Sequence, residues 1–302
     1  YQYILGIQSY ASHDSGASII KFKKNKIVDF VAISEDRLVR RKHTYAFPVH
    51  SISYCLKHFK LKNLSKISYI YSDWIKQKKW MRSGPGYNYQ MYDYLKEKLK
   101  FNKDKIIQIN HHLCHAASVF YTSNFRKSAI LIIDGLGSDN ETHSIFRGVN
   151  SQIKFIARYK HRGIGSLYAA ITEKIGLGFG GEGKTMGLAP YGKKSQTFKT
   201  YKFKNLETNF SDVMYRHPLS DVLNHIHPNY KRPKLKIKIS QNKTKKMSTY
   251  FKNLAFDIQD LAENTMEHLG KVTQKITKEK KLCLAGGVAL NSVGNNKILR
   301  NS

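Results

Sequence analysis

Short apolar runs separated by polar loops predict several β-strands at the start of the chain. Residues 3–7, 17–22 and 27–34 are rich in β-branched and aromatic side chains, as strands usually are. A loop of small and polar residues separates the first two runs, and a lysine-rich turn at residues 23–26 separates the second and third. We therefore expect a strand, a polar loop and then a hairpin.

The same pattern returns about 126 residues further along the chain. Strands are expected at residues 129–133, 142–148 and 153–159, and residues 134–141 (DGLGSDNE) form the loop between the first two. A duplicated unit with a small-residue loop in each copy would let two lobes hold a phosphate-bearing ligand. The pattern is similar to the actin-like ATPase fold, in which two ribonuclease-H-like halves bind ATP. A chance similarity between two hairpins is the alternative.

Apolar positions with helical spacing connect these strands. They predict helices at residues 48–59, 89–100, 111–120, 166–175 and 250–277. The fold class is therefore α/β.

The chain ends in a strand at residues 282–285, the turn Gly286-Gly287 and a helix that runs to Leu299. Such a unit requires a further strand beside it. We expect a first lobe at residues 1–128, which carries the helix 111–120. We expect a second lobe at residues 129–302, C-terminally incomplete and interrupted by an exposed, lysine-rich insertion at about residues 193–246.

Two histidines on one predicted helix are the main candidate for a metal site. His111 and His115 are four residues apart, which places both imidazoles on one helix face. Asp134 ends the next predicted strand and can add a carboxylate oxygen. Two imidazoles and a carboxylate suit iron, zinc or manganese better than magnesium. Incidental helical histidines are the alternative, and Cys114 is either a further ligand or a small buried thiol.

Two glycine-rich stretches are candidates for binding a nucleotide. Residues 178–185 (GFGGEGKT) match the phosphate-loop expression, but a predicted helix precedes them and we expect residues 186–190 not to be helical, so we reject a P-loop. Glycine amides can still approach an anion and Lys184 can neutralise a phosphate. At the end of the chain, a nucleotide can pass close to the bare backbone of Gly286 and Gly287. Glycines that serve packing alone are the alternative.

Two further residues are candidates for catalysis. His13, in the first loop, can act as a base towards a hydroxyl, and Lys42, in a basic cluster, can hold an anionic leaving group. An exposed cationic surface is the simpler interpretation of that cluster.

The chain is strongly basic. It has 52 Lys and Arg against 21 Asp and Glu, a net charge of +31, which makes nucleic acid a candidate partner. Lysine is nevertheless spread along the chain, as compositional bias would produce, and no recognised nucleic-acid motif is present. Three cysteines without close pairing indicate a reducing compartment, and neither a signal peptide nor a long apolar run is present. We expect a cytoplasmic protein that does not enter a membrane.

Taken together, these segments resemble the antibiotic and nodulation carbamoyltransferases, the family often called NodU/CmcH. The order and spacing of the motifs agree over nearly the whole chain. The matching motifs include HDSGAS at 13–18, SEDRLVRRKH at 34–43, NHHLCHAAS at 110–118, GEGKTMGLAPYG at 181–192 and LAGGVALN at 284–291.

The resemblance implies a domain that binds iron and an ATP-derived nucleotide, and that moves a carbamoyl group from carbamoyl adenylate to the hydroxyl of a small acceptor. A second, C-terminal domain of the family makes this adenylate from carbamoyl phosphate and ATP. The implied site residues are the metal ligands His111, His115 and Asp134, the catalytic residues His13 and Lys42, and the nucleotide-loop residues Gly286, Gly287 and Asn291. To the nucleotide site we add Gly135 and Gly137 from their loop, and Glu182 and Lys184 from their charge.

The sequence departs from the family at its end. The family's last metal ligand, an aspartate, and the adenylate-forming domain both lie beyond the equivalent of Ser302. We therefore expect this chain to bind metal poorly and to lack the complete reaction.

Two other functions fit part of the pattern. A tRNA threonylcarbamoyl transferase of the TsaD kind shares the metal-bearing helix and would explain the charge, although residues 34–43 and 181–192 favour the antibiotic-type family. A nucleotide-binding module without catalysis is the other. The acceptor, the metal and the oligomeric state are not specified by the sequence.

Overall fold

The computed structural model describes most of the chain in two compact units. The units divide between Asn110 and His111. The sequence placed the boundary between residues 128 and 129. Because the second unit begins at His111, the helix that carries the paired histidines lies in the second unit rather than the first. The described residues are 1–8, 14–24, 26–42, 44, 47–73, 101–160, 163–178, 180–208, 210, 212–213 and 248–301.

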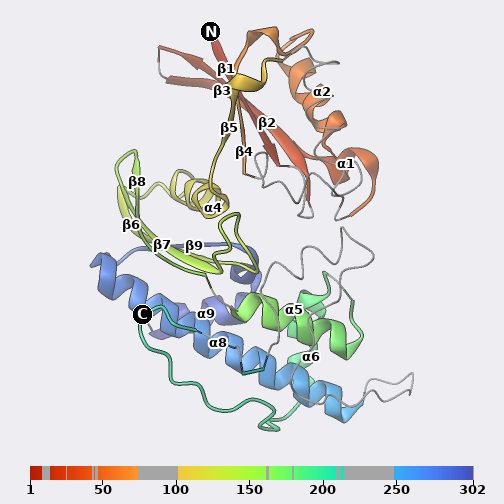
Figure 1. Ribbon diagram of the computed structural model, residues 1–302, viewed down its shortest axis with the longest axis vertical. Coiled ribbons are helices and arrows are strands. Elements are labelled where there is room, and N and C mark those ends of the chain that lie inside the picture. The colour runs from red at the N-terminus through yellow and green to blue at the C-terminus, as the bar shows by residue number, and fades with distance from the viewer. Residues whose placement is uncertain are drawn as a thin grey trace. The chain divides into compact units, whose positions relative to one another are not determined.

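The first unit is built on a five-stranded sheet (Figure 1). Its strand order is β3-β2-β1-β4-β5. The first three strands are antiparallel neighbours, whereas β4 is parallel to β1 and β5 is parallel to β4. The strands are β1 (Gln2–Gln8), β2 (Gly16–Lys23), β3 (Lys26–Ser34), β4 (Ile67–Ser72) and β5 (Ile106–Gln108).

Helix α2 (Val49–His58) covers one face of this sheet. Alternate residues of β1 and β2, among them Leu5 and Ile19, are fully buried there against Ile52 and Leu56 of the helix. The pattern predicted this helix and the first three strands, but it did not predict β4 and β5. The predicted helix at residues 89–100 lies outside the described residues.

A buried carboxylate holds the start of α2. Glu35 begins the short helix α1 (Glu35–Val39) and is 1% exposed. It accepts hydrogen bonds from the backbone N–H groups of His50 (3.1 Å) and Ser51 (2.7 Å), and from the Ser51 hydroxyl (2.5 Å). Burial raises the pKa of Glu35, but these hydrogen bonds, together with one to His50 Nδ1 at 2.6 Å, outweigh it and hold the pKa below its ordinary value. The first amides of a helix lack intrahelical partners and favour a negative charge, so Glu35 fastens α1 to α2.

Replacing Glu35 by glutamine should therefore loosen α2. The amide keeps the shape but loses the charge and half of the acceptor capacity, a cost of about 2–3 kcal/mol for hydrogen bonds to a charged group. We expect amide hydrogen exchange in α2 to become about 30–100 times faster. Asp29→Asn, which changes a half-exposed carboxylate of β3, is the matched control and should change exchange little. Equal effects of the two substitutions would contradict the role given to Glu35.

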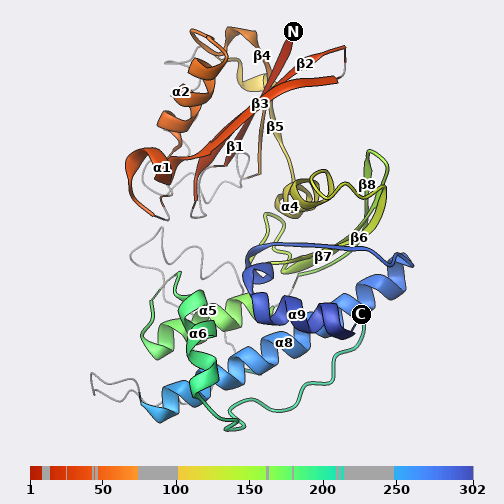
Figure 2. The ribbon, with the colours of Figure 1, turned by 180° about the vertical axis from the view of Figure 1, so that it is seen from behind.

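The second unit is built on a four-stranded sheet covered on both faces (Figures 1 and 2). Helix α4 (His111–Phe120) lies on one face, and α5 (Ile164–Ile175), α8 (Thr249–Thr277) and α9 (Ser292–Asn301) lie on the other. The strand order is β8-β7-β6-β9, with β6, β7 and β8 antiparallel and β9 parallel to β6. The strands are β6 (Lys127–Ile133), β7 (His143–Val149), β8 (Gln152–Tyr159) and β9 (Leu282–Ala285).

The two sheets share one topology. In each, a strand is followed by an antiparallel hairpin, and a later strand then pairs in parallel with the other edge of the first. Each hairpin also contains one register irregularity, between Lys21 and Phe22 in one sheet and between Ile145 and Phe146 in the other. The duplication predicted from the sequence is confirmed.

Helix α8 supplies much of the second core. It is 29 residues long, and the side chain of the preceding Ser248 caps it by accepting a hydrogen bond from the Phe251 N–H. One face of the helix, with Leu254, Ile258 and Met266, packs under the sheet. In the part of the chain that the structure describes, no helix is both long and apolar enough to cross a membrane.

The start of the lysine-rich insertion is tied to α8 and the core of the second unit. Asp257 of α8 accepts hydrogen bonds from the backbone N–H groups of Ser195 (3.0 Å) and Thr197 (2.8 Å), and Phe210 is fully buried in the core. Aromatic side chains between the lysines cause this, because they pack against α8. Most residues of 193–208 are nevertheless exposed, as expected, while their aromatic side chains are partly buried against the core. Residues 214–247 lie outside the described part.

This packed segment is also held by His143 of β7. His143 Nε2 donates to the Leu206 carbonyl at 2.7 Å, and burial lowers the pKa of His143 to about 4. The pKa of His143 is lower in the folded state than in the unfolded state, so the unfolded state binds the proton more readily. The folded protein therefore loses stability as the pH falls. Above about pH 6.5 the imidazole is neutral in both states, so it has no effect there.

We expect the stability of the second unit to fall between about pH 6.5 and pH 4, by about 3 kcal/mol from this histidine alone. His143→Gln, which can still donate but does not titrate in this range, should flatten that part of the curve. Urea unfolding measured across this range for both proteins gives the comparison. Parallel curves would show that His143 is not the titrating group.

Candidate metal centre and nucleotide loop

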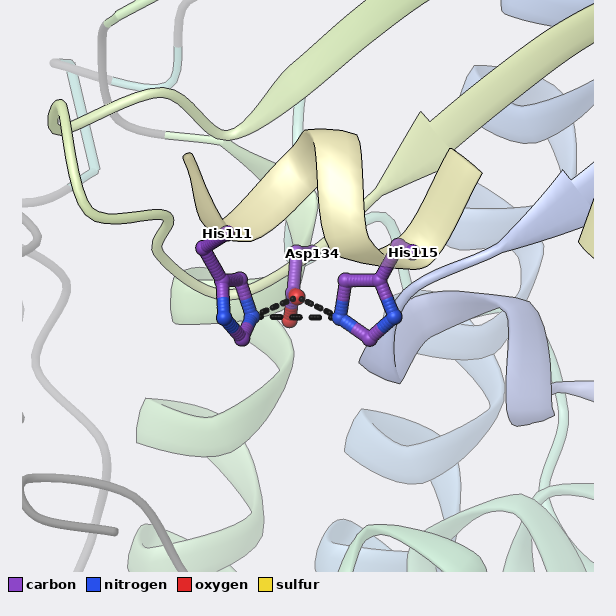
Figure 3. A group of neighbouring side chains, drawn as sticks. All are labelled: His111, His115 and Asp134. Carbon is purple, nitrogen blue, oxygen red and sulfur yellow. Dashed lines mark hydrogen bonds and ion pairs between the residues drawn. The ribbon is translucent and has the colours of Figure 1, made fainter. Parts of the chain in front are cut away.

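Helix α4 presents its two predicted ligands at one face. Its apolar side, with Ala116 and Phe120, packs on the sheet of the second unit against Ile130 and Ile132 of β6. His111 and His115 lie one turn apart, and both point toward the end of β6, where Asp134 follows the strand (Figure 3). Because the helix packs directly on β6, the three side chains meet within one unit.

The three ligand atoms form a nearly equilateral triangle. Asp134 Oδ2 lies 3.1 Å from His111 Nε2 and 3.0 Å from His115 Nε2, and the two nitrogens are 3.1 Å apart. The side chains of His111, His115 and Asp134 are 14%, 30% and 15% exposed, so an ion can reach them from solvent. The predicted meeting of two imidazoles and a carboxylate is observed.

The triangle matches the spacing of metal ligands. Ligand atoms on one face of an octahedral ion with bonds of about 2.1 Å lie about 3.0 Å apart, whereas tetrahedral bonds of that length separate them by about 3.4 Å. The observed separations of 3.0–3.1 Å are hydrogen-bond distances, and they are close to the spacing of ligand atoms that converge on one ion. Among the residues that the structure describes, one group of three or more His, Cys, Asp or Glu side chains is close enough together to hold a metal ion, and it consists of these three residues. Cys114, which lies between the histidines on α4, is not in this group.

Asp134 connects the triangle to the glycine loops through its second oxygen. Asp134 Oδ1 accepts from its neighbour Gly135 N at 2.7 Å and from Gly287 N at 3.2 Å. Burial raises the pKa of Asp134, but hydrogen bonds and charge from His111 and His115 outweigh it and hold the pKa well below its usual range. One ionised carboxylate thus joins α4, the β6–β7 loop and the turn after β9.

The turn after β9 depends on glycine. Gly286 has φ +99°, which side-chain-bearing residues rarely adopt, and a Cβ there would lie 2.3 Å from the Ile133 carbonyl oxygen. Gly287 begins a short 3₁₀-helix, η6 (Gly287–Leu290), and a Cβ there would meet Asp134 Oδ1 at 3.0 Å. The two glycines allow the turn to pass close to the end of β6, beside the candidate ligand Asp134.

The side chain of Asn291 makes its hydrogen bonds to other residues of the protein. Its amide pairs reciprocally with that of Gln259 on α8, and its Oδ1 also accepts from Gly294 N at 3.0 Å in the first turn of α9. The Tyr168 hydroxyl donates to Gln259 Oε1 at 2.8 Å. Asn291 therefore fixes the direction in which α9 leaves the glycine turn, a role that local sequence did not indicate.

The other glycine-rich stretch lies between two helices. Helix α5 precedes it, as predicted, but α6 (Glu182–Leu188) follows it, so the expectation of non-helical residues at 186–188 is wrong. Packing explains the difference. The Thr185 hydroxyl hydrogen-bonds the Thr172 hydroxyl at 2.8 Å, and Leu188 packs on the core. These contacts outweigh the low helix propensity of Gly183 and Gly187. No strand precedes the stretch, so rejecting a P-loop remains justified.

Glu182 and Lys184 lie on this helix. Glu182 is in the first turn of α6. Burial of the Tyr168 hydroxyl raises the pKa of Tyr168, and the negative charges of Glu182 and Glu263 raise it further. Lys184 is exposed. The N–H of Gly137, in the loop after Asp134, donates a hydrogen bond to the Glu141 carbonyl at 2.7 Å. Neither Glu182 nor Lys184 nor Gly137 belongs to the triangle of candidate ligand atoms.

The candidate catalytic segments of the first unit meet at Ser15. Its N–H donates to the Thr44 carbonyl at 3.0 Å, and its carbonyl accepts from Glu35 N at 2.7 Å. Ser15, two residues after His13, is thereby joined to Thr44, two residues after Lys42, and to Glu35. Lys42 is exposed, and His13 itself lies outside the described residues.

Comparison with known proteins gives one family and one fold. A family model described as "Carbamoyltransferase N-terminus" matches residues 62–302. Nodulation protein NolNO of Sinorhizobium fredii is 28% identical over 95% of this chain and 42% of its own length. An uncharacterized protein of Synechocystis sp. is 29% identical over 99% of this chain and 52% of its own length. The chain thus spans about half of the length of these relatives.

Among solved structures, full-length HypF in its phosphate- and nucleotide-bound form is similar to this chain. The TM-score is 0.53 at 13% identity, over 99% of this chain and 50% of HypF. This similarity and the duplicated sheets confirm the actin-like ATPase fold predicted from the sequence.

Proposed function

Because this chain belongs to the carbamoyltransferase N-terminal family, we propose that it forms the carbamoyl-transferring domain of an ATP-dependent O-carbamoyltransferase. In the proposed reaction an acceptor hydroxyl attacks the carbonyl carbon of carbamoyl adenylate. The new C–O bond gives the carbamate ester, the bond to the phosphate oxygen breaks, AMP leaves, and the hydroxyl proton is released. The observation that carries the proposal is the His111–His115–Asp134 triangle, joined through Asp134 to the glycine turn.

His111, His115 and Asp134 would hold a divalent ion, and a donor set of two imidazoles and one carboxylate suits Fe²⁺. When bound, such an ion supplies Lewis-acid charge that stabilises negative charge developing on an acyl or phosphate oxygen. The residues themselves supply orientation. Asp134 holds the amides of Gly135 and Gly287, and this fixes both loops at one end of the sheet.

The nucleotide would lie against the glycine turns. The bare backbone at Gly286 and Gly287 lets a phosphate come close, and the N-terminal turn of α9 favours an anion. Exposed Lys184 is free to turn toward a phosphate, and Glu182 is suited to accept hydrogen bonds from nucleotide hydroxyls. Asn291 would act by fixing the direction of α9.

His13 and Lys42 are the proposed catalytic side chains of the first unit. His13 would take the proton from the acceptor hydroxyl, and Lys42 would stabilise charge on the departing phosphate. Support comes from the family motifs and from the backbone bonds of Ser15, which hold the two segments together.

The test supplies carbamoyl adenylate, labelled in the carbamoyl carbon, to the protein with Fe²⁺ and a panel of hydroxylated sugars. Supplying the adenylate makes the result independent of how carbamoyl phosphate and ATP are activated. We expect label on an acceptor, release of AMP, and a rate at least about 100-fold lower in His13→Asn, since a positioned base contributes about 10²–10⁴-fold. Unchanged transfer in His13→Asn would remove that residue as the base, and no AMP release above the solution rate would contradict the function.

The net charge of +31 supports tRNA as a second candidate acceptor. The same assay with tRNA distinguishes the two. Label on tRNA, lost at raised salt, would replace a small acceptor by a nucleic-acid one.

A further inference from the structure

We propose that Ser138 is a positioning residue that holds the metal-bearing helix in register with the Asp134 loop. Its hydroxyl oxygen accepts a hydrogen bond from the backbone N–H of His111 at 3.0 Å. The proposal rests on the proposed metal site at His111, His115 and Asp134. The two residues of the bond are 27 positions apart in the chain.

The bond takes the place of a helix cap. The first amides of an α-helix have no partner within the helix, and a serine hydroxyl is among the best acceptors for them. In α4 this acceptor comes from the β6–β7 loop. Ser138 therefore fixes both the start of the helix and its distance from the loop.

The loop that carries Ser138 is itself rigid. Gly137 N donates to the Glu141 carbonyl at 2.7 Å, Asn140 N to the Gly137 carbonyl at 3.0 Å, and Asp139 N to Glu141 Oε2 at 2.7 Å. Glu141 is fully buried, and a Cβ at position 137 would lie 2.5 Å from its side chain. A hydroxyl fixed on such a loop can position the helix, because the loop has little freedom to follow it.

The loop then holds His111 at two points. Asp134 Oδ2 contacts the imidazole Nε2 at 3.1 Å, and Ser138 Oγ contacts the backbone N–H of the same residue at 3.0 Å. With backbone and ring tip both fixed, the ring has little freedom to leave the triangle. Support of this kind, one step removed from the metal, typically changes affinity by about 10–100-fold.

The same loop reaches the nucleotide side. Asp134 Oδ1 accepts from Gly287 N, and the Ser166 hydroxyl of α5 donates to the Gly135 carbonyl at 3.0 Å. Metal binding should stabilise the loop geometry that also holds the glycine turn. By linkage, metal should then raise the affinity for ATP, and ATP the affinity for metal.

The test measures Co²⁺ binding from its visible absorption in wild type, Ser138→Ala, Ser138→Thr and Ser118→Ala. Ser118 is the matched control, because it is an exposed serine of the same helix whose hydroxyl donates only to the nearby His115 carbonyl. We expect Ser138→Ala to bind Co²⁺ about 10–100-fold more weakly, with Ser118→Ala and Ser138→Thr within about threefold of wild type. The Co²⁺ spectrum of Ser138→Ala should also change, which a loss of folding elsewhere would not produce.

ATP affinity with and without Co²⁺ gives a second readout. Co²⁺ should strengthen ATP binding in wild type and less so in Ser138→Ala, while amide exchange in α8 stays unchanged and shows that the unit is folded. Co²⁺ binding by Ser138→Ala within threefold of wild type, or equal weakening in Ser118→Ala, would overturn the proposal while leaving the metal site intact. Absence of Co²⁺ binding in wild type, even at Co²⁺ concentrations high enough to saturate a weak site, would overturn the proposal together with the metal site.

Discussion

Replacing Asp134 by asparagine should weaken divalent-metal binding by more than about a hundredfold, since loss of an outer partner alone costs about 10–100-fold. Asparagine keeps the size of the side chain and an oxygen for the amides of Gly135 and Gly287. It loses the negative charge that compensates the cation and that the two imidazoles now surround. The fold should therefore persist while the metal site is lost.

Calorimetric titration with Co²⁺ measures this effect. The matched control is Asp139→Asn, in the same loop, where the carboxylate is about half exposed and pairs with Arg158. That substitution should change metal affinity less than about threefold, because a surface ion pair contributes little. Similar affinities in wild type and Asp134→Asn would mean that the metal, if bound, lies elsewhere.

Replacing Gly286 by alanine should destabilise the second unit and abolish measurable ATP binding. The new Cβ would lie 2.3 Å from the Ile133 carbonyl oxygen, and the φ of +99° adds strain of about 1–3 kcal/mol. Relief requires the turn to move away from β6. Such a movement breaks the Gly287 bond to Asp134 and removes the surface on which the nucleotide would lie.

Gly176→Ala separates strain from collision. Gly176 ends α5 with φ +88°, yet an added Cβ there has no atom within 4 Å. We expect a stability loss of about 1 kcal/mol and unchanged ATP affinity for this variant. Urea unfolding and equilibrium ATP binding on both variants provide the measurement. If Gly286→Ala retained ATP affinity within threefold, the glycine turn would not be part of the nucleotide site.

Local patterns predicted the elements that carry the metal ligands. The four-residue spacing of His111 and His115, and a carboxylate directly after a strand, are short-range signals that depend only on helix and strand periodicity. Strands β4 and β5 escaped prediction, because their parallel pairing with strands distant in sequence leaves only a weak signal in the sequence. Helix α6 was missed because its glycines disfavour a helix that packing on α5 and the core restores.

The residues that hold the site in place had no local signal. Ser138 acts on a backbone amide 27 residues away, and Gln259 pairs with an asparagine 32 residues further along. Glu35 caps a helix that begins 14 residues later. Each of these roles depends on which elements pack together, so only the folded structure reveals it.

X-ray absorption on the Fe²⁺-loaded protein tests the metal centre most directly, because it reports which atoms bind the ion and at what distance. The triangle of His111 Nε2, His115 Nε2 and Asp134 Oδ2 predicts two imidazole nitrogens and at least one carboxylate oxygen at about 2.1–2.2 Å. The imidazole signal should disappear in a His111→Ala, His115→Ala double variant. An ion surrounded only by oxygen atoms in the wild-type protein would contradict the assignment.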